Sequence, residues 1–438
     1  MKTKINNNLH YFNVLDEDLI VNKNTGAVYE ISPDIAGFFK DFNEYEDTYN
    51  EVIKELGSLI TDKKSIEDYR KTAERLEKED IAPNSLCLII SGNCNFRCSY
   101  CYGKYGRKNT PSYDMDEETS LAAVDFLFTQ NSGNIEFDLF GGEPLLNWPV
   151  CVKTIEYIDK KKKDSDKKVK IALTTNGYLL SDEKIAFLNK YDVNLVFSLD
   201  GDKNCHDKMR KHVNGSDTFD KVYESLEKLL KSRKDNYYVR GTYAGKTLDF
   251  SSSFKFYMDK GIKYFSLEPI VRSSDEYGVK DSDLLKVDKE YDKCAKYLIE
   301  ASKEGREFDF YHFNLNIYKP PCVEKRLRAC AAGVKYFAVD YNGDIYPCHQ
   351  FVGVKEFKMG SITEGVIDKD IADIFKKNHI FNKGECSNCW VKVYCSGGCA
   401  AANYFTNGDI LKPDKISCDI MKIRTKYALA YNILKQRG

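Results

Sequence analysis

Between residue 85 and about residue 310, the hydrophobic and polar positions switch repeatedly between two periods. Short apolar or alternating runs, typical of β-strands, are each followed by a stretch with apolar residues at helical spacing. Such repetition predicts a parallel sheet with right-handed crossovers. Six strands are too few for a complete eight-fold barrel, so we expect an α/β fold with a partial, TIM-like (β/α)6 barrel. The predicted strands are Leu86–Ser91, Ile135–Phe140, Val169–Thr174, Asn194–Ser198, Tyr237–Tyr243 and Tyr264–Leu267, and the predicted helices lie near Asp116–Thr129, Val150–Lys163, Ser181–Tyr191, Thr218–Ser232 and Phe254–Lys260.

The pattern of residues 1–80 predicts a small module of its own. Three short strands precede three helical stretches, which begin near Ser32, Tyr49 and Ser65. We interpret this segment as a winged-helix-like module with an exposed sheet edge, which can accept an extended peptide as an added strand. A plain N-terminal cap on the next domain explains these residues equally well. The predicted strands are His10–Val14, Leu19–Val21 and Gly26–Ile31.

Polar and glycine-rich segments follow the first four strands of the repeat. Each alone is an ordinary turn, but the C-terminal strand ends of such a barrel meet where chemistry takes place, so together they predict one site. In the second segment, glycines let the backbone approach a ligand, and Glu143 can accept a hydrogen bond from an amine. The segments are Cys94-Asn-Phe-Arg-Cys98-Ser-Tyr100-Cys101, Gly141-Gly142-Glu143-Pro144, Thr174-Thr-Asn176-Gly177, and Ser198-Leu-Asp200-Gly201 with Arg210 beyond it.

The three cysteines of the first segment have the C-x3-C-x2-C spacing that suits a cubane iron–sulfur cluster. A cubane has four irons and this loop supplies three thiolates, so one iron stays open for a substrate. Cys94, Cys98 and Cys101 are therefore the predicted metal ligands and catalytic centre. A zinc knuckle is the alternative from spacing alone.

Composition narrows the function classes. The 438 residues include 66 Lys and Arg against 67 Asp and Glu, and a formal net charge of −1 argues against general nucleic-acid binding. We expect no membrane association, because no apolar stretch approaches the roughly 20 residues that span a bilayer and the start lacks a signal-peptide pattern. The expected location is the cytoplasm, where structural disulfides are disfavoured, so the 15 cysteines indicate bound metal.

Eight of these cysteines fall after residue 320. With the three of the first loop they make eleven, which fits one open cubane and two fully ligated ones. A zinc ribbon is the alternative for the Cys386-x2-Cys389 pair. Four further cysteines sit in strand or helix patterns and are expected to be buried: Cys87, Cys151, Cys205 and Cys294. The eight are Cys322, Cys330, Cys348, Cys386, Cys389, Cys395, Cys399 and Cys418.

Residues 85–310 resemble a radical S-adenosylmethionine (radical SAM) enzyme, in the three-cysteine loop, the Gly-Gly-Glu-Pro motif and the partial barrel together. This resemblance implies that the open iron binds the amino and carboxylate groups of S-adenosylmethionine, whose reductive cleavage yields a 5′-deoxyadenosyl radical. It implies amino-group contacts from Gly141, Gly142 and Glu143. It also implies that Tyr100 packs beside the adenine, and that Asn176, Ser198 and Arg210 contact the ribose and carboxylate.

The later cysteines resemble the SPASM extension of these enzymes, which carries auxiliary clusters. That pattern implies one cluster on Cys330, Cys348 and Cys399, with Cys322 as a possible fourth ligand. It implies a second cluster on Cys386, Cys389, Cys395 and Cys418, and so three [4Fe-4S] clusters in all. The implied domains are a precursor-recognition element (1–80), the radical SAM barrel (85–310) and the SPASM domain (311–438).

The N-terminal module resembles the precursor-recognition element of peptide maturases, and the run from Gly343 to Gly353 resembles maturases of cysteine-rich clostridial peptides, which form thioether cross-links. The resemblance implies a ribosomal precursor bound through its leader, and an electron donor such as flavodoxin or ferredoxin. The alternatives are a carbon–carbon cross-linking maturase, a sulfatase maturase that forms formylglycine, and a ferredoxin-like or zinc-stabilised protein. Asp200, Glu268 and His349 are acid–base candidates by position only.

Overall fold

The computed structural model describes residues 8–40, 63–103, 113–271, 276–315, 317 and 322–437. The helix predicted at 49–59 lies outside these residues. The chain forms two compact units, each assembled from separate segments. We call residues 80–279 and 330–376 the parallel-sheet unit, and residues 1–79, 280–329 and 377–438 the antiparallel-sheet unit. The division into three domains made from the sequence stays a prediction.

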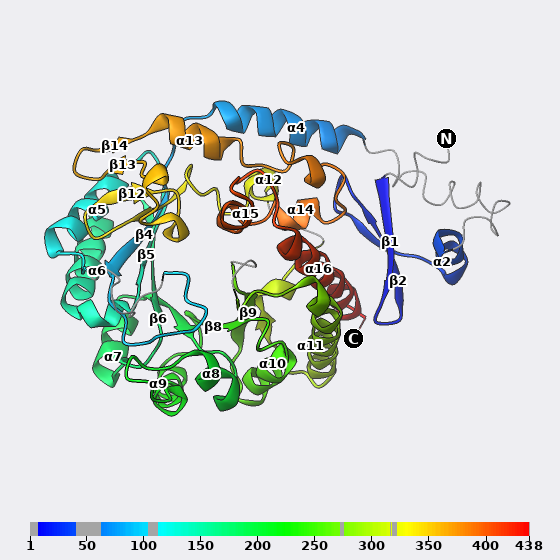
Figure 1. Ribbon diagram of the computed structural model, residues 1–438, viewed down its shortest axis with the longest axis horizontal. Helices are drawn as coiled ribbons and strands as arrows, with labels where there is room; N and C mark the ends of the chain where they lie inside the picture. Colours follow the sequence, from blue (N-terminus) through cyan, green and yellow to red (C-terminus); the bar gives the residue numbers. More distant parts are fainter. Residues whose placement is uncertain are drawn as a thin grey trace. The chain divides into compact units, whose positions relative to one another are not determined.

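In the parallel-sheet unit, strands β4 to β9 are hydrogen-bonded in chain order and all run parallel. Helices α5 to α10 lie on the outer side of these strands (Figure 1). The predicted α/β fold with a parallel sheet is therefore confirmed, and its description as a six-unit partial barrel stays a prediction. The elements are β4 (Ser85–Ser91), α5 (Glu117–Thr129), β5 (Asn134–Gly141), η1 (Pro144–Asn147), α6 (Trp148–Lys163), β6 (Lys168–Thr175), α7 (Asp182–Lys190), β7 (Asn194–Ser198), α8 (Lys203–Met209), α9 (Phe219–Ser232), β8 (Tyr237–Tyr243), α10 (Phe250–Asp259) and β9 (Tyr264–Pro269).

Local sequence explains where several helices begin. Asp116 caps α5 by accepting a hydrogen bond from the Thr119 N–H (2.7 Å), and Ser181 caps α7 in the same way. Helix α10 begins at Phe250 and not at Phe254, so its predicted start was wrong. Serine favours helix interiors only weakly, so the serines at 251–253 gave no helical signal in the sequence. The first turn of α10 nevertheless forms there, and its Phe250 side chain is buried.

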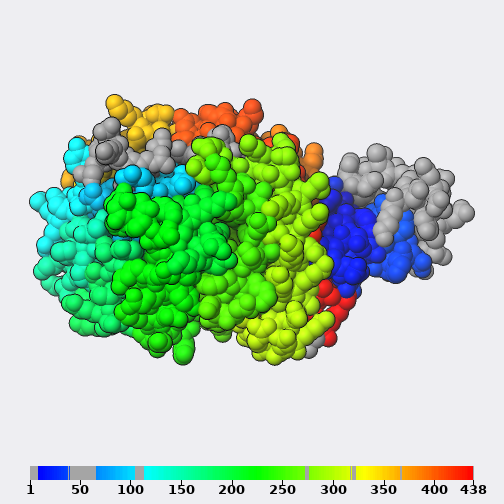
Figure 2. Space-filling view, turned by 60° about the horizontal axis from the view of Figure 1, so that its bottom comes forward, coloured from blue at the N-terminus to red at the C-terminus, as the bar shows by residue number. Residues whose placement is uncertain are grey.

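The chain returns to this sheet after residue 330. Strand β11 pairs in parallel with β4, and three further strands continue from it as an antiparallel ribbon. Residues from the cysteine-rich part of the sequence thus extend the same sheet. On the face seen in Figure 2, the green segments of the unit form a continuous surface. The added elements are β11 (Tyr336–Val339), β12 (Asp344–Tyr346), η4 (His349–Phe351), η5 (Lys355–Phe357), β13 (Gly360–Ser361), β14 (Val366–Ile367) and α13 (Lys369–Lys376).

The antiparallel-sheet unit contains the three strands predicted near the start of the chain, in the order β1-β2-β3. Leu15 and Asp16 have φ values of 54° and 64°, and two such residues make the tight turn that joins β1 to β2. Its arrangement as a winged helix stays a prediction. The elements are β1 (Leu9–Val14), β2 (Glu17–Asn22), β3 (Val28–Glu30), α2 (Pro33–Lys40) and α4 (Lys63–Lys78).

Segments from the second half of the chain complete this unit. Helix α16 packs against α11 and β1, and Val21 of β2 shares an apolar cluster with Trp390, Val391 and Leu429. No helix in the described part of the chain is long and apolar enough to cross a bilayer. The remaining elements are η2 (Asp281–Asp283), α11 (Leu284–Lys303), β10 (Asp309–Phe310), η3 (Tyr311–Phe313), α12 (Val323–Arg328), η6 (Gly384–Cys386), α14 (Lys392–Cys395), α15 (Ala400–Asn407) and α16 (Lys415–Leu434).

Candidate active site and cysteine clusters

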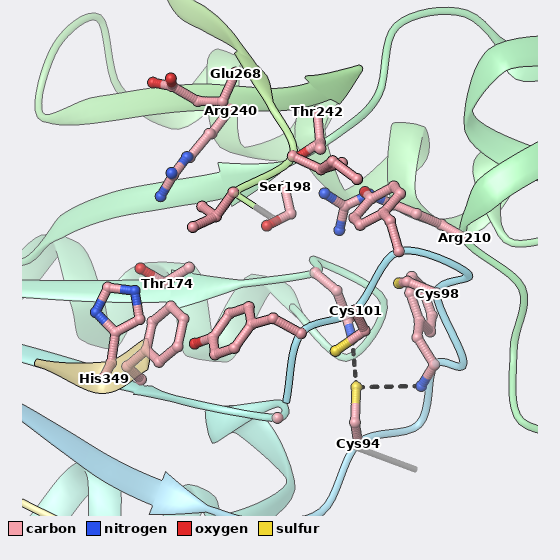
Figure 3. A pocket seen from close by; sticks show the side chains of 18 of the residues that line it. Cys94, Cys98, Cys101, Thr174, Ser198, Arg210, Arg240, Thr242, Glu268 and His349 are labelled. Carbon is pink, nitrogen blue, oxygen red and sulfur yellow. Dashed lines mark hydrogen bonds between the residues drawn. The ribbon is translucent and has the colours of Figure 1, made fainter. Parts of the chain in front are cut away.

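A cavity in the parallel-sheet unit opens at the C-terminal ends of strands β5 to β9. Cys94, Cys98 and Cys101 all line it and lie together at one end (Figure 3). Burial raises the pKa of the Cys98 thiol to about 12. The Phe96 N–H donates to Cys94 Sγ (3.3 Å), and the Arg97 N–H donates to the Lys211 carbonyl (2.7 Å). The loop that carries the three thiols is therefore tied to the chain beyond α8.

Gly141 and Gly142 bring the end of β5 directly against the cysteine loop. A Cβ at Gly141 would meet the Ser91 carbonyl oxygen at 2.2 Å, and one at Gly142 would meet the Asn93 oxygen at 2.1 Å. The Gly142 N–H donates to Ser91 O (2.8 Å). No other residue type fits this close backbone approach, for which the sequence singled out the glycines. Both line the cavity, as predicted ligand contacts should.

Glu143 is fully buried and does not line the cavity. Its carboxylate accepts hydrogen bonds from Thr175 Oγ1 (2.7 Å), the Asn176 N–H (2.7 Å) and the Leu145 N–H (3.1 Å). Burial raises its pKa to about 7, and these donors oppose the rise. The side chain joins the ends of β5 and β6, so its contact with a ligand amine stays a prediction.

The other four predicted contacts all line the cavity: Tyr100, Asn176, Ser198 and Arg210. The Asn176 amide donates to Asn95 Oδ1 (2.8 Å) and faces Cys94 Sγ at 3.9 Å. The structure thus gathers around one cavity residues that lie more than a hundred positions apart, as the strand-end pattern predicted.

Asp200 lies behind this wall, buried and outside the cavity lining. Its carboxylate forms an ion pair with Arg210 Nε (2.9 Å), accepts from the Tyr100 hydroxyl, and accepts from the Thr242 N–H (2.8 Å). The Asp200 N–H donates to His206 Nδ1 (3.3 Å). Asp200 therefore joins the cysteine loop to β7 and β8, and it has no open face for proton transfer in the cavity.

The far side of the cavity carries polar residues that the sequence did not single out as ligand contacts. Arg240 and Thr242 occupy alternate positions of β8, and Gln350 lies beside His349. The Arg240 guanidinium is directed toward the side that holds Thr174 and His349 (Figure 3). Polar residues at every second position of an otherwise buried strand were the available signal, because alternate side chains share one face.

Of the three acid–base candidates, Glu268 and His349 line the cavity. His349 Nδ1 lies 2.7 Å from the Tyr336 hydroxyl. Burial and, as the smaller cause, the charge of Arg240 together lower the pKa of His349 to about 4. The imidazole is therefore neutral at physiological pH and presents its ring to the cavity.

A second cysteine group lies within the antiparallel-sheet unit. Cys386, Cys389, Cys395 and Cys418, which come from η6, the following turn, α14 and α16, are close enough to perturb one another electrostatically. The Gly398 N–H donates to the Cys395 carbonyl oxygen (3.3 Å). Burial raises the pKa of Cys386 to about 11 and that of Cys418 to about 12. The assembly of these four thiols into the ligand set of one auxiliary cluster stays a prediction.

The remaining predicted ligands are divided between the two units. Cys330 and Cys348 belong to the parallel-sheet unit, whereas Cys322 and Cys399 belong to the antiparallel-sheet unit, so their assembly into one cluster stays a prediction. In the described residues no group of three or more histidine, cysteine or acidic side chains is arranged to hold a single metal ion. Of the four cysteines expected in the core, Cys87, Cys151 and Cys294 are buried and Cys205 is half-buried.

Two family models match the chain. The Radical SAM superfamily model matches residues 88–249, which include the three-cysteine loop and strands β5 to β8. The SPASM model, described as an iron-sulfur cluster-binding domain, matches residues 330–390.

Curated relatives extend over most of the chain. The radical SAM cyclopropyl synthase TigE of Paramaledivibacter caminithermalis is 23% identical over 413 residues, which cover 87% of this chain and 82% of TigE. A cysteine-type anaerobic sulfatase-maturating enzyme of Clostridium perfringens is 27% identical over 345 residues, which cover 72% and 88%.

Solved structures share the fold. Native anSMEcpe with bound AdoMet and Kp18Cys peptide matches with a TM-score of 0.68 at 22% identity, over 81% of this chain and 100% of that one. Streptococcus suis SuiB bound to precursor peptide SuiA matches with a TM-score of 0.54 at 16% identity, over 94% and 99%.

Proposed function

We propose that this chain, which is a radical SAM enzyme with a SPASM domain, joins a cysteine sulfur of a ribosomal precursor peptide to a carbon atom of another residue. Enzymes of this kind act on peptides or on sulfatases. The observation that carries the peptide assignment is the antiparallel-sheet unit, in which a three-stranded sheet and a four-cysteine group are packed together.

The cavity of the parallel-sheet unit fits S-adenosylmethionine at an iron–sulfur cluster. Cys94, Cys98 and Cys101 would hold three irons. Gly141 and Gly142 line the same cavity, where the absence of side chains lets β5 lie against Ser91 and Asn93. Bound S-adenosylmethionine supplies, on one-electron reduction, a 5′-deoxyadenosyl radical that removes a hydrogen atom from a substrate carbon. Tyr100, Asn176, Ser198 and Arg210 are the side chains proposed to orient it, together with the Gly141–Glu143 segment.

The leader of the precursor is proposed to bind along β3. This strand is the last of its sheet, and an end strand offers backbone groups to an added strand. The SuiB structure with its precursor peptide, which matches most of this chain, supports a fold able to host a peptide. The reductant would be a flavodoxin or ferredoxin.

The proposed cluster content is three. The four-cysteine group takes one auxiliary cluster, and Cys330, Cys348 and Cys399 take the other, with Cys322 as its fourth ligand. Iron analysis and Mössbauer spectroscopy of Cys322→Ala test the last point. Loss of a cluster supports ligation, whereas a full iron content shows an open site able to bind a substrate thiolate.

The test of the function uses anaerobically reconstituted enzyme, dithionite, S-adenosylmethionine and, as substrate, each short cysteine-rich peptide encoded by a neighbouring open reading frame. A thioether removes two hydrogens per cross-link and leaves one cysteine resistant to iodoacetamide. An unchanged peptide mass would contradict the proposal. Tandem mass spectrometry then locates the bond.

A sulfatase maturase is the second candidate, because the Clostridium perfringens relative shares 27% identity over most of the chain. Its product, formylglycine, is an aldehyde that reacts with hydrazides. A carbon–carbon or cyclopropyl product also loses two hydrogens, but every cysteine of the peptide stays open to alkylation. The same mass spectra therefore separate the three outcomes.

A further inference from the structure

Two lysines beside the four-cysteine group are buried to a degree unusual for this residue type. Lys383 is 1% exposed and Lys392 is 4% exposed. Lys383 Nζ donates to the Gly397 carbonyl (2.6 Å), and Lys392 Nζ donates to the Ser387 carbonyl (2.8 Å). Ser387 directly follows Cys386, and Gly397 lies two residues after Cys395, so both ammonium groups are held against the backbone beside these cysteines.

A buried ammonium group is strongly unfavourable unless an anion compensates for its lost hydration. In the described part of the chain, neither lysine forms an ion pair with a carboxylate. Ionised as cluster ligands, Cys386, Cys395, Cys399 and Cys418 would stabilise the Lys383 ammonium, and Cys389 and Cys386 would stabilise that of Lys392. The compensating anion must therefore be formed by the cysteine group itself.

We propose that Lys383 and Lys392 are the counter-ions of the cluster held by Cys386, Cys389, Cys395 and Cys418, and that they raise its reduction potential. This inference rests on the cluster assignment made above. A cluster with four thiolate ligands is anionic and gains a further negative charge on reduction. A fixed cation in a poorly hydrated site stabilises the reduced form more than the oxidised form.

The reaction gives such tuning a use. Joining a C–H and an S–H group into a C–S bond releases two hydrogens. One leaves as a hydrogen atom to the adenosyl radical, and the other leaves as a proton and an electron, so an electron acceptor is required. A higher reduction potential, set by Lys383 and Lys392, makes the cluster of the four-cysteine group a better acceptor for this electron than the same cluster without the two lysines.

The test is an EPR-monitored redox titration of the full-length, anaerobically reconstituted chain. Substituting alanine for Cys94, Cys98 and Cys101 removes the first cluster, and adding Cys389→Ala identifies the signal of the four-cysteine group. In the background that lacks only the first cluster, Lys383→Met and Lys392→Met should each shift this potential to more negative values. We expect at least a tenfold change in the reduction equilibrium, which is about 59 mV for one electron.

Two variants act as controls. Lys383→Arg keeps the charge and should retain most of the potential. Lys415→Met removes the same charge from a side chain that is 70% exposed on α16, where solvent screens it, and should leave the potential unchanged.

Iron content is measured in every variant. Potentials unchanged in both methionine variants, or zinc in place of iron at this site, would overturn the inference. If Lys383→Met loses the cluster, the reduction potentials of Lys392→Met and Lys383→Arg provide the test: the first should become more negative and the second should stay near the wild-type value. The titration needs no peptide, so a shifted potential with an unmodified peptide refutes the proposed function and leaves this inference standing.

Discussion

Replacing Asp200 with alanine should destabilise the parallel-sheet unit strongly. The change leaves the Arg210 guanidinium, whose side chain is 10% exposed, without its 2.9 Å partner, and removes the acceptor of the Tyr100 hydroxyl and the Thr242 N–H. Breaking a buried ion pair at one end costs about 3–5 kcal/mol. At about 2–4 °C per kcal/mol for a unit of this size, the melting temperature should fall by roughly 6–20 °C.

The assay follows the fluorescence of Trp148 on α6 during thermal unfolding of the metal-free chain. The sequence has two tryptophans, so a Trp390→Phe background makes Trp148 the reporter of the parallel-sheet unit. Asp220→Ala is the control, because it breaks an exposed pair with Lys203 and should cost at most about 1 kcal/mol.

A double variant tests the cause. In Asp200→Leu with Arg210→Met no buried charge is left unpaired, so its destabilisation should be smaller than the sum of the two single changes. A fall in melting temperature no larger than that of Asp220→Ala, or strict additivity in the double variant, would refute this reasoning.

Three further predictions follow from the same unit. Burial lowers the pKa of His206 to about 3 in the folded chain, against an ordinary value of 6.5. The contribution of the neutral imidazole to the free energy of unfolding should therefore be complete above pH 6.5 and decline as the pH falls toward 3. Urea unfolding across this pH range should show a weaker pH dependence in His206→Asn than in the wild type. Gly142→Ala should lower iron content and S-adenosylmethionine cleavage at least tenfold because its Cβ meets the Asn93 oxygen, whereas Gly133→Ala, with open space around it, should change neither. Cys98→Ala should abolish S-adenosylmethionine cleavage while about two thirds of the iron remains, measured by colorimetric iron analysis and product chromatography.

Local spacing was enough to predict several residues that line the cavity. The three cysteines lie within one loop. Two consecutive glycines at a strand end, Gly141 and Gly142, indicate a close approach of the backbone to another group. Glu143 shows the limit, because its orientation depends on hydrogen bonds from Thr175 and Asn176, which belong to another strand. The sequence around a strand-end carboxylate does not show which groups will donate hydrogen bonds to it.

The pairing of distant strands and the burial of lysine side chains could not be predicted from the local sequence pattern. Strand β11 joins β4 although some 250 residues separate them, and no local signal specifies that register. Lys383 and Lys392 read as ordinary surface lysines, since this residue type is rarely buried. Their burial depends on tertiary contacts, among them the hydrogen bonds to Gly397 and Ser387, which the local sequence pattern does not specify.

The apolar cluster that joins Val21 to Trp390 and Leu429 has a consequence for synthesis on the ribosome. Strand β2 is made early, but the side chains that cover it emerge after nearly four hundred further residues, whereas the strands and helices between β4 and α10 are complete much sooner. The apolar face of the N-terminal sheet must therefore stay partly exposed to solvent while the intervening unit folds. This apolar face and the four-cysteine group both need residues made after position 385, so they are completed together as one late event.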